Sequence, residues 1–224
     1  MNAVQSKPNV KYQAVTIISN TEIAPNAFLL SFERGFSFRA GQVLGLALSP
    51  NDDARLYSIA SGENDKNIDI LYNIKPGGKL TPSLAALNPS DTLWITVPFG
   101  SYAGSAEPAY WIAAGTGIAP FRSMARSGLA KGKTLLHGGR SLDLFYFDKE
   151  LSETSGANYI KCCSHHHGDG VFHGRVTRFL EEADNLPTDQ KYYLCGSAEM
   201  VVDCREILIA KGIPYNNIVA EIYF

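Results

Sequence analysis

Residues 110–120 have the sequence YWIAAGTGIAP, and this stretch decides the fold of the second half of the chain. Residues 110–114 form a continuous apolar run, which is typical of a strand buried on both faces of a parallel sheet. A GTG turn follows, and a helix is predicted from residue 119 to about residue 127. A phosphate-binding turn needs this strand–turn–helix order, although Pro120 stands where the dinucleotide fingerprint has its third glycine.

Downstream of this turn, apolar strands alternate with helices to the end of the chain. The pattern predicts strands at residues 134–137, 159–163, 192–195 and 218–223, and helices at 176–182 and 199–210. Buried apolar strands that alternate with helices indicate an α/β domain with a doubly wound parallel sheet.

Upstream of the turn the sequence pattern differs, because short β-branched or aromatic segments are separated by Pro, Gly, Asn and Asp. The pattern predicts strands at residues 12–18, 27–32, 42–48, 55–60 and 68–74, and one short helix at 82–87. Many short strands with such turns predict an antiparallel β-barrel. Because residues 103–108 are small, flexible and polar, we expect one domain at residues 1–106 and a second at 107–224.

The bulk composition excludes several classes of protein. The net charge of −2 gives no general reason to expect nucleic acid. There is no apolar run of about 18 residues, so no membrane span is expected, and the polar start without a signal-peptide core predicts a cytoplasmic protein. Cys162, Cys163, Cys195 and Cys204 form no CxxC pair, so zinc or iron–sulfur sites are not expected and reduced thiols are favoured over disulfides.

The first candidate binding segment is RLYSIAS at residues 55–61. In a strand, Arg55 and Tyr57 share one face and Ser58 points to the other, unless the strand end blurs the alternation. A guanidinium fork suits a diphosphate, and a tyrosine ring suits a flat heterocycle. The segment therefore fits a dinucleotide with a flat ring system, and the alternative is a plain half-exposed strand.

The second candidate is GGKLTP at residues 77–82. Thr81 is a good N-cap and Pro82 suits the first position of a helix. Glycines before a helix allow backbone N–H groups to approach a phosphate closely. The alternative is a glycine-rich turn before a capped helix.

Two further segments lie near the end of the chain. Cys195, in LCGSAEM at residues 194–200, is predicted to end a central strand, where ligands of open α/β sheets sit. The alternative is a buried structural cysteine. The chain ends in EIYF, and its two terminal aromatics either stack on a flat cofactor or pack on the barrel.

In this order and spacing, the five segments resemble the ferredoxin–NADP reductase superfamily over nearly the whole chain. The motifs that carry the resemblance are Arg-x-Tyr-Ser, Gly-Thr-Gly-x-Ala-Pro and Cys-Gly-x-x-x-Met. The ending Glu-x-Tyr-aromatic resembles the bacterial stand-alone reductases, which often end in Trp where this chain has Phe224. The resemblance implies FAD in the barrel, a nicotinamide nucleotide in the α/β domain, and hydride transfer between the two.

The resemblance also implies roles for residues of the barrel. Arg55 would pair with the FAD pyrophosphate, Tyr57 would pack on the isoalloxazine ring, and Ser58 would hydrogen-bond near flavin N5. Leu56 lies in the same cofactor-binding strand. The pyrophosphate would also be held at a helix N-terminus by Gly78, Lys79, Leu80 and Thr81.

In the second domain, the resemblance implies that Thr116 and Gly117 line the path of the nicotinamide nucleotide. Cys195 would lie near the nicotinamide and Glu221 by the active site. Tyr223 would stack on the other face of the flavin. Phe224 would pack against the FAD adenine or the edge of the ring.

The choice of nucleotide depends on residues after the second parallel strand. NAD-binding folds commonly place an acidic residue there to bind the ribose 2′-OH, whereas this chain has Arg140, which favours a 2′-phosphate. The family's second phosphate-contact region aligns with Ser164-His165 and with Gly174-Arg175, with His165 where an arginine is often found. We therefore expect NADP(H), with NAD(H) as the alternative because Asp143 lies close to Arg140. The adjacent histidines 165–167 are poorly spaced for one ion, so no metal site is expected.

The expected partner is a separate electron carrier of the ferredoxin or flavodoxin type, because the chain contains no iron–sulfur or haem module. Two alternatives remain. The chain could be the reductase component of an oxygenase system, or a flavin or quinone reductase that uses NADH. It could also be a non-catalytic subunit that binds flavin and nucleotide within an electron-transfer complex.

Overall fold

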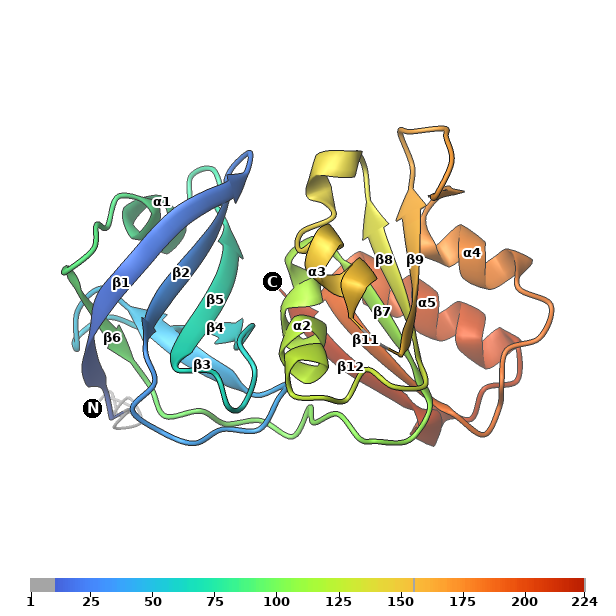
Figure 1. Cartoon of the computed structure of the whole chain (residues 1–224), viewed down its shortest axis with the longest axis horizontal. Helices are drawn as coiled ribbons and strands as arrows, with labels where there is room; N and C mark the ends of the chain where they lie inside the picture. Colours follow the sequence, from blue (N-terminus) through green and yellow to red (C-terminus); the bar gives the residue numbers. More distant parts are fainter. Residues whose placement is uncertain (1–10, 155, 224) are drawn as a thin grey trace, which may run out of the picture.

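The computed structural model describes residues 11–154 and 156–223, which form two halves side by side (Figure 1). The first half is a six-stranded antiparallel sheet in the order β4-β3-β6-β1-β2-β5. Its elements are β1 (Gln13–Ala24), β2 (Ala27–Glu33), β3 (Val43–Ala47), β4 (Arg55–Ser58), β5 (Asn67–Asn73), α1 (Leu80–Ala85) and β6 (Thr92–Ile95).

The antiparallel sheet curls until its two end strands meet. Ile59, directly after β4, forms an isolated bridge with Ile70 of β5, and the N–H of Ala60 donates to the carbonyl of Asp69 at 2.8 Å. The curl encloses a core whose buried side chains include Ile17, Leu30, Phe32, Leu44 and Tyr72. The predicted antiparallel barrel is therefore confirmed as a curled sheet.

Two strands of the barrel differ from the sequence prediction. β1 continues to Ala24 instead of ending at residue 18, and β6 is not predicted at all. Only Ile17 of β1 is buried, so the strand lacks the apolar alternation on which the prediction depends. β6 has four residues, which is too short to give a clear pattern.

The second half is a parallel sheet in the order β10-β9-β8-β7-β11-β12. Its strands are β7 (Ala109–Ala114), β8 (Lys133–Gly139), β9 (Ala157–Cys163), β10 (Phe172–His173), β11 (Lys191–Ser197) and β12 (Ile218–Tyr223). Its helices are α2 (Ala119–Arg126), α3 (Asp148–Glu153), α4 (Val176–Glu182) and α5 (Ala198–Ala210), with short 3₁₀ segments η1 (Gly115–Ile118), η2 (Leu142–Leu144) and η3 (Tyr215–Asn217).

Successive residues of β7 show that the parallel sheet is covered on both faces. Trp111 and Ala113 pack with Phe121 and Met124 of α2, whereas Ile112 belongs to the core on the opposite face. That second core includes Val176 and Leu180 of α4 and Val201, Cys204 and Leu208 of α5. The predicted doubly wound α/β fold is confirmed. Figure 1 shows α2 on the side toward the barrel and α4 and α5 on the far side. None of the helices in the described residues is long and apolar enough to cross a membrane.

Helix α1 begins one residue before the expected cap, so the predicted capping arrangement is wrong. Leu80 is its first residue, Lys79 occupies the N-cap without a side-chain hydrogen bond, and Pro82 is the third helical residue. The Thr81 hydroxyl instead accepts from the N–H of Lys75 at 2.8 Å, which closes the preceding turn on itself. Thr81 therefore stabilises the turn rather than the end of the helix.

Helix α3 and strand β10 are also absent from the prediction. α3 has six residues and β10 has two, so neither produces a recognisable period. α3 starts after Phe147, whose φ of 62° places it in the left-handed region that a phenylalanine rarely adopts.

The segment between β6 and β7 contacts first the barrel and then, a few residues later, the core of the second half. Phe99 exchanges two backbone hydrogen bonds with Val43 of the barrel, at 3.0 and 2.9 Å. Tyr102 makes edge contacts with Phe121 and Tyr193 in the core of the second half. A domain boundary between residues 106 and 107 stays a prediction.

Candidate active site

Two of the predicted site residues lie toward the carboxyl ends of the neighbouring strands β11 and β12. Cys195 of β11 pairs with Ala113 of β7 on one side and with Glu221 of β12 on the other. Register pairing therefore places the Cys195 and Glu221 side chains next to each other. From the barrel, Ser58 lies at the last residue of β4.

Ser58, Cys195 and Glu221 meet at one carboxylate oxygen, and we call them the Ser58 cluster. The Ser58 hydroxyl donates to Glu221 Oε2 at 2.8 Å, and the Cys195 thiol lies 3.9 Å from the same oxygen. Ser58 is 2% exposed and Cys195 is fully buried. Burial raises the pKa of Glu221, and the contacts from Ser58 and Cys195 offset part of that rise. The cluster thus joins two halves of the chain through a carboxyl group that takes up a proton more readily than an exposed one.

The Gly-Thr-Gly segment touches this cluster through the backbone. It forms the 3₁₀ turn η1 between β7 and α2. A Cβ atom on Gly117 would lie 2.1 Å from the carbonyl oxygen of Cys195, so a larger residue cannot occupy this position. Gly117 is therefore needed to bring the turn against the end of β11, and the half-buried Thr116 lies beside it.

Strand β4 carries the other predicted cofactor residues of the barrel. Exposure falls along it from Arg55 and Leu56, which are exposed, through the half-buried Tyr57 to the buried Ser58. The expected alternation is therefore replaced by a gradient toward the end of the strand. Tyr57 packs edge-on against Tyr72 with 6.4 Å between ring centroids. Burial raises the pKa of Tyr57 to about 12, against the opposing effect of Arg55, so the ring is a neutral phenol at physiological pH.

The Gly77–Thr81 turn belongs to the barrel half. Gly78 N–H donates to the Lys75 carbonyl at 2.9 Å, and Lys79 is exposed. Leu80 packs against the barrel core. The turn is therefore anchored on the barrel, with an exposed cation at its tip.

Arg140 and Arg175 lie beyond the carboxyl ends of β8 and β9, and both are exposed. The Arg140 carbonyl accepts from the N–H of His165 at 2.9 Å, so the two predicted phosphate-contact regions are adjacent. Arg175 is the N-cap residue of α4 and forms an ion pair with Glu199 at 3.5 Å. Asp143 is engaged by the Ser141 hydroxyl at 2.5 Å.

The histidine-rich loop folds onto a neighbouring strand. The rings of His167 and His173 stack with centroids 3.4 Å apart, and His173 Nδ1 lies 3.2 Å from the carbonyl of His166. Within residues 11–154 and 156–223, no group of three or more His, Cys, Asp or Glu side chains is arranged to hold a metal ion.

The last two predicted site residues are only partly described. The backbone of Tyr223 belongs to β12 and pairs with Ser197. The side chain of Tyr223 and the whole of Phe224 lie outside the described residues, so their roles stay predictions.

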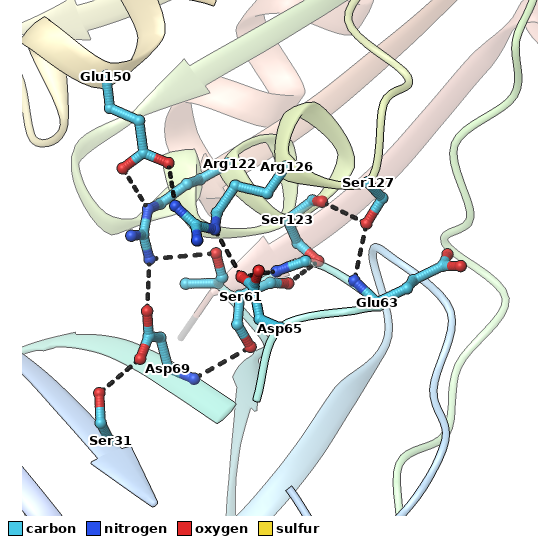
Figure 2. Close-up of polar contacts among 12 residues, drawn as sticks. Ser31, Ser61, Glu63, Asp65, Asp69, Arg122, Ser123, Arg126, Ser127 and Glu150 are labelled. Carbon is cyan, nitrogen blue, oxygen red and sulfur yellow. Dashed lines mark hydrogen bonds and ion pairs between the residues drawn. The ribbon is translucent and has the colours of Figure 1, made fainter. Parts of the chain in front are cut away.

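Sequence reasoning missed a set of charged residues at the junction of the halves. Arg122 and Arg126 of α2 bond to Asp69 and Asp65 of the barrel and to Glu150 of α3 (Figure 2). No motif marks these residues. The one signal in the sequence is a pair of arginines one helical turn apart, and a solvated helix face shows the same spacing.

Comparison with known proteins matches both halves to family models. Residues 14–103 match the oxidoreductase FAD-binding domain, and residues 111–206 match the oxidoreductase NAD-binding domain. Ferredoxin–NADP reductase B of Sorangium cellulosum is 30% identical over 234 residues, which covers 92% of this chain and 96% of that protein.

Other relatives are longer than this chain. The reductase component of propane 2-monooxygenase from Rhodococcus jostii is 28% identical over 203 residues, which covers 82% of this chain and 55% of the relative. The corresponding protein of Mycolicibacterium smegmatis is covered to 66% of its length. Among solved structures, a ferredoxin NADP+ reductase from Neisseria gonorrhoeae with bound FAD and NADP superimposes with a TM-score of 0.84 at 20% identity, over 96% of this chain and 99% of that one. This likeness shows the shared two-domain fold.

Proposed function

Since the chain belongs to the ferredoxin–NADP reductase superfamily, we propose that it moves hydride between NADP(H) and FAD and exchanges single electrons with a separate carrier. The observation that carries this proposal is the Ser58 cluster. One carboxyl oxygen of Glu221 is contacted by the Ser58 hydroxyl from the barrel and by the Cys195 thiol from the α/β half. The two bound ring systems would have to meet at this place. FAD, when bound, accepts two electrons as a hydride and releases them one at a time.

The barrel residues fit a flavin dinucleotide. β4 is the end strand of the sheet order, and Arg55 at its start is exposed and available to a diphosphate. The neutral, half-buried ring of Tyr57 offers a flat surface for an isoalloxazine ring. The Gly78–Thr81 segment would approach the same pyrophosphate from the turn before α1. With flavin bound, the Ser58 hydroxyl would hydrogen-bond near N5.

The second half fits a nicotinamide nucleotide. Gly117 places the η1 turn against Cys195. A nicotinamide bound along Thr116 and Gly117 would therefore lie next to the Cys195 thiol. Cys195 would pack against that ring and Glu221 would hold a proton close to it, while Tyr223 would stack on the flavin. Holding the two rings in contact and excluding water is the contribution of the protein to hydride transfer.

The exposed arginines favour NADP(H) over NAD(H). Arg140 lies on a loop that a backbone hydrogen bond joins to His165, and Arg175 is the N-cap residue of α4. Both are exposed, beyond the strands where an adenosine 2′-phosphate would lie. Asp143 is engaged by Ser141, and this leaves Arg140 as the side chain that would meet a phosphate. We place the protein in the cytoplasm, in keeping with its four free cysteines.

In the first form of the proposal the carrier is a ferredoxin, which the name of the relative from Sorangium cellulosum suggests, or a flavodoxin. The second candidate is a reductase that serves an oxygenase, because several relatives are reductase components of such systems. Turnover with a ferredoxin, a flavodoxin, a quinone and free flavin as separate acceptors distinguishes the two forms.

The deciding experiment is anaerobic rapid mixing of the purified protein with NADPH and with NADH. We expect a yellow protein with noncovalent FAD, established by mass analysis of the released flavin, that NADPH reduces faster than NADH. Release of FMN alone would refute the cofactor, because Arg55 and the Gly78–Thr81 turn are two contacts for one diphosphate. A flavin that neither nucleotide reduces would refute the function.

A further inference from the structure

Arg122 of α2 is buried at the junction of the halves and has partners on both sides. Its Nη1 donates to Asp69 Oδ2 at 2.9 Å and lies 3.3 Å from the carbonyl of Ala60. Its Nε donates to Glu150 Oε2 at 3.0 Å, and its guanidinium carbon lies 4.2 Å from the centre of the Phe147 ring. One side chain therefore ties α2 to β5, to the segment that follows β4, and to α3 (Figure 2).

Two of the barrel partners of α2 lie two and three residues after Ser58. Ala60 is bonded by Arg122, and the Ser123 hydroxyl donates to the carbonyl of Ser61 at 2.6 Å. The same stretch is bonded to β5, because the Ser61 hydroxyl accepts from the N–H of Asp69 at 3.1 Å. We call the residues Ala60, Ser61, Asp69, Arg122, Ser123 and Glu150 the α2 seam. The seam holds the chain two to three residues beyond the Ser58 hydroxyl.

The other end of α2 leads directly to Cys195. The η1 turn runs into α2 without a break, and Gly117 of that turn lies against the carbonyl of Cys195. Cys195 and its strand neighbour Glu221 in turn meet the Ser58 hydroxyl. Ser58, the α2 seam, η1 and Cys195 thus form a closed ring of contacts around the junction.

We propose that Arg122 is a positioning residue, which fixes β4 against α2 so that Ser58 faces Cys195 and Glu221 at the distance hydride transfer needs. This inference rests on the proposed function for its kinetic consequence, whereas the placement itself concerns the protein alone. Lysine cannot substitute, because one ammonium group cannot reach Glu150, Asp69 and Ala60 together and has no flat face for Phe147.

Arg126 provides a matched control from the same helix. Its side chain is 36% exposed, compared with 7% for Arg122, and it bonds to Asp65 in the loop before β5 and to Glu150. It also joins the two halves, but none of these partners adjoins Ser58. Arg126→Lys therefore makes the same chemical change in the same helix without releasing the end of β4.

The test compares Arg122→Lys and Arg126→Lys by two measurements. In rapid mixing with saturating NADPH, we expect Arg122→Lys to reduce its flavin at least about tenfold more slowly, with KM changed by less than about twofold, because small misplacements cost rate rather than binding. Amide hydrogen exchange should rise in peptides that cover residues 55–61 and stay unchanged in β2. Arg126→Lys should stay within about twofold of the wild type in rate and leave exchange at residues 55–61 unchanged.

Equal rates and equal exchange for the two lysine variants would overturn the proposal. If Arg122→Lys fails to fold, Ser123→Ala decides, since it removes one hydrogen bond between α2 and Ser61. Faster exchange at residues 55–61 and a slower reduction would then support the proposal, and wild-type values would overturn it. A wild-type protein that no nicotinamide nucleotide reduces would refute the proposed function, while the exchange data would still decide whether Arg122 positions β4.

Discussion

Two of the places where the halves of the molecule meet differ sharply in chemistry. The α2 seam is dense and charged, with a buried arginine held by two carboxylates and two hydroxyl groups nearby. The Ser58 cluster meets the barrel through a neutral hydroxyl, and its contacts across the junction include one hydrogen bond of 2.8 Å. Buried ion pairs fix geometry because separating them leaves an unpaired charge in a poorly solvated place. A single hydroxyl–carboxyl hydrogen bond contributes less, typically about 0.5–1.5 kcal/mol.

This difference teaches how a site between two domains can be held rigid. The seam supplies the fixed distance, and the cluster brings a hydroxyl, a thiol and a carboxyl group together at the junction. The largest test of this division is therefore a comparison of stability when each place is broken in turn.

Arg122→Met should lower the free energy of unfolding by about 3–5 kcal/mol, because Asp69 then remains at the junction without its counter-charge. Ser58→Ala should lower it by about 1–2 kcal/mol, the cost of leaving a buried acceptor without its hydrogen bond. Denaturant midpoints of the two variants measure the contrast. Adding Asp69→Asn to Arg122→Met removes the orphaned charge and should recover at least about 1 kcal/mol. Equal losses for Arg122→Met and Ser58→Ala would show that the seam is no stronger than the cluster.

The two halves were also unequally predictable from the sequence. The parallel strands β7 and β11 are continuous apolar runs, so their positions and the helices between them follow from pattern alone. In the barrel, the polar end of β1 and the four-residue β6 lack such a pattern, because a curled sheet exposes one face of each strand. The position of Thr81 inside α1 could not be predicted either, since its hydroxyl prefers a backbone partner in the preceding turn.

The site shows the same contrast between local and long-range information. Ser58, Cys195 and Glu221 were each predicted, because each lies in a recognisable motif, although β11 continues two residues beyond Cys195, which the prediction placed at its end. The α2 seam was missed because its contacts join residues that are 53 and 62 positions apart, and no spacing in the sequence encodes them. Charged residues on a helix ordinarily indicate a solvated face, so the burial of Arg122 could not be predicted from the sequence.

A second prediction concerns a region remote from both meeting places. Arg140→Ala should raise the KM for NADPH about ten- to hundredfold, since a charge-assisted contact to a 2′-phosphate contributes about 1.5–3 kcal/mol. The KM for NADH and the reduction rate at saturation should stay unchanged. Arg175→Ala should act in the same direction but less, because Arg175 is already paired with Glu199. Steady-state kinetics with both nucleotides measure the effect.

The NADP assignment would be wrong if the wild type prefers NADH or if both variants lose the two nucleotides equally. Arg178→Ala is the matched control. Arg178 is exposed on the same helix as Arg175 and pairs with Glu182 one turn further along. Its removal should leave both KM values unchanged.

A third prediction separates the thiol of the Ser58 cluster from its hydroxyl. Cys195→Ala should slow flavin reduction about tenfold, which corresponds to about 1.4 kcal/mol in the barrier, because the ring that packs on the thiol loses its alignment. The FAD content should stay the same, since Cys195 belongs to the α/β half. Rapid mixing and the ratio of flavin to protein absorbance give the two values. Cys204→Ala is the control, because Cys204 is equally buried but packs between α5 and the opposite face of the sheet. Similar kinetic losses in both variants would mean that Cys195 only fills space.

The smallest effect is expected from the carboxyl group that both halves share. Burial raises the pKa of Glu221 above that of the unfolded chain, so the folded protein binds the extra proton more tightly. The stability that this proton contributes is present in full below the unfolded pKa and is lost as the pH rises through the folded pKa. Glu221→Gln is neutral at every pH and does not suffer this loss.

At pH 7 we therefore expect the Glu221→Gln variant to melt above the wild type by no more than about 4 °C, or roughly 1 kcal/mol for a chain of this size. As the pH falls through the folded and then the unfolded pKa, the wild-type carboxyl takes up its proton and the two melting temperatures should converge. The same variant should reduce its flavin more slowly, since an amide cannot exchange a proton at this position. A variant less stable than the wild type at pH 7 would show that Ser58 and Cys195 stabilise the ionised carboxylate more than burial penalises it.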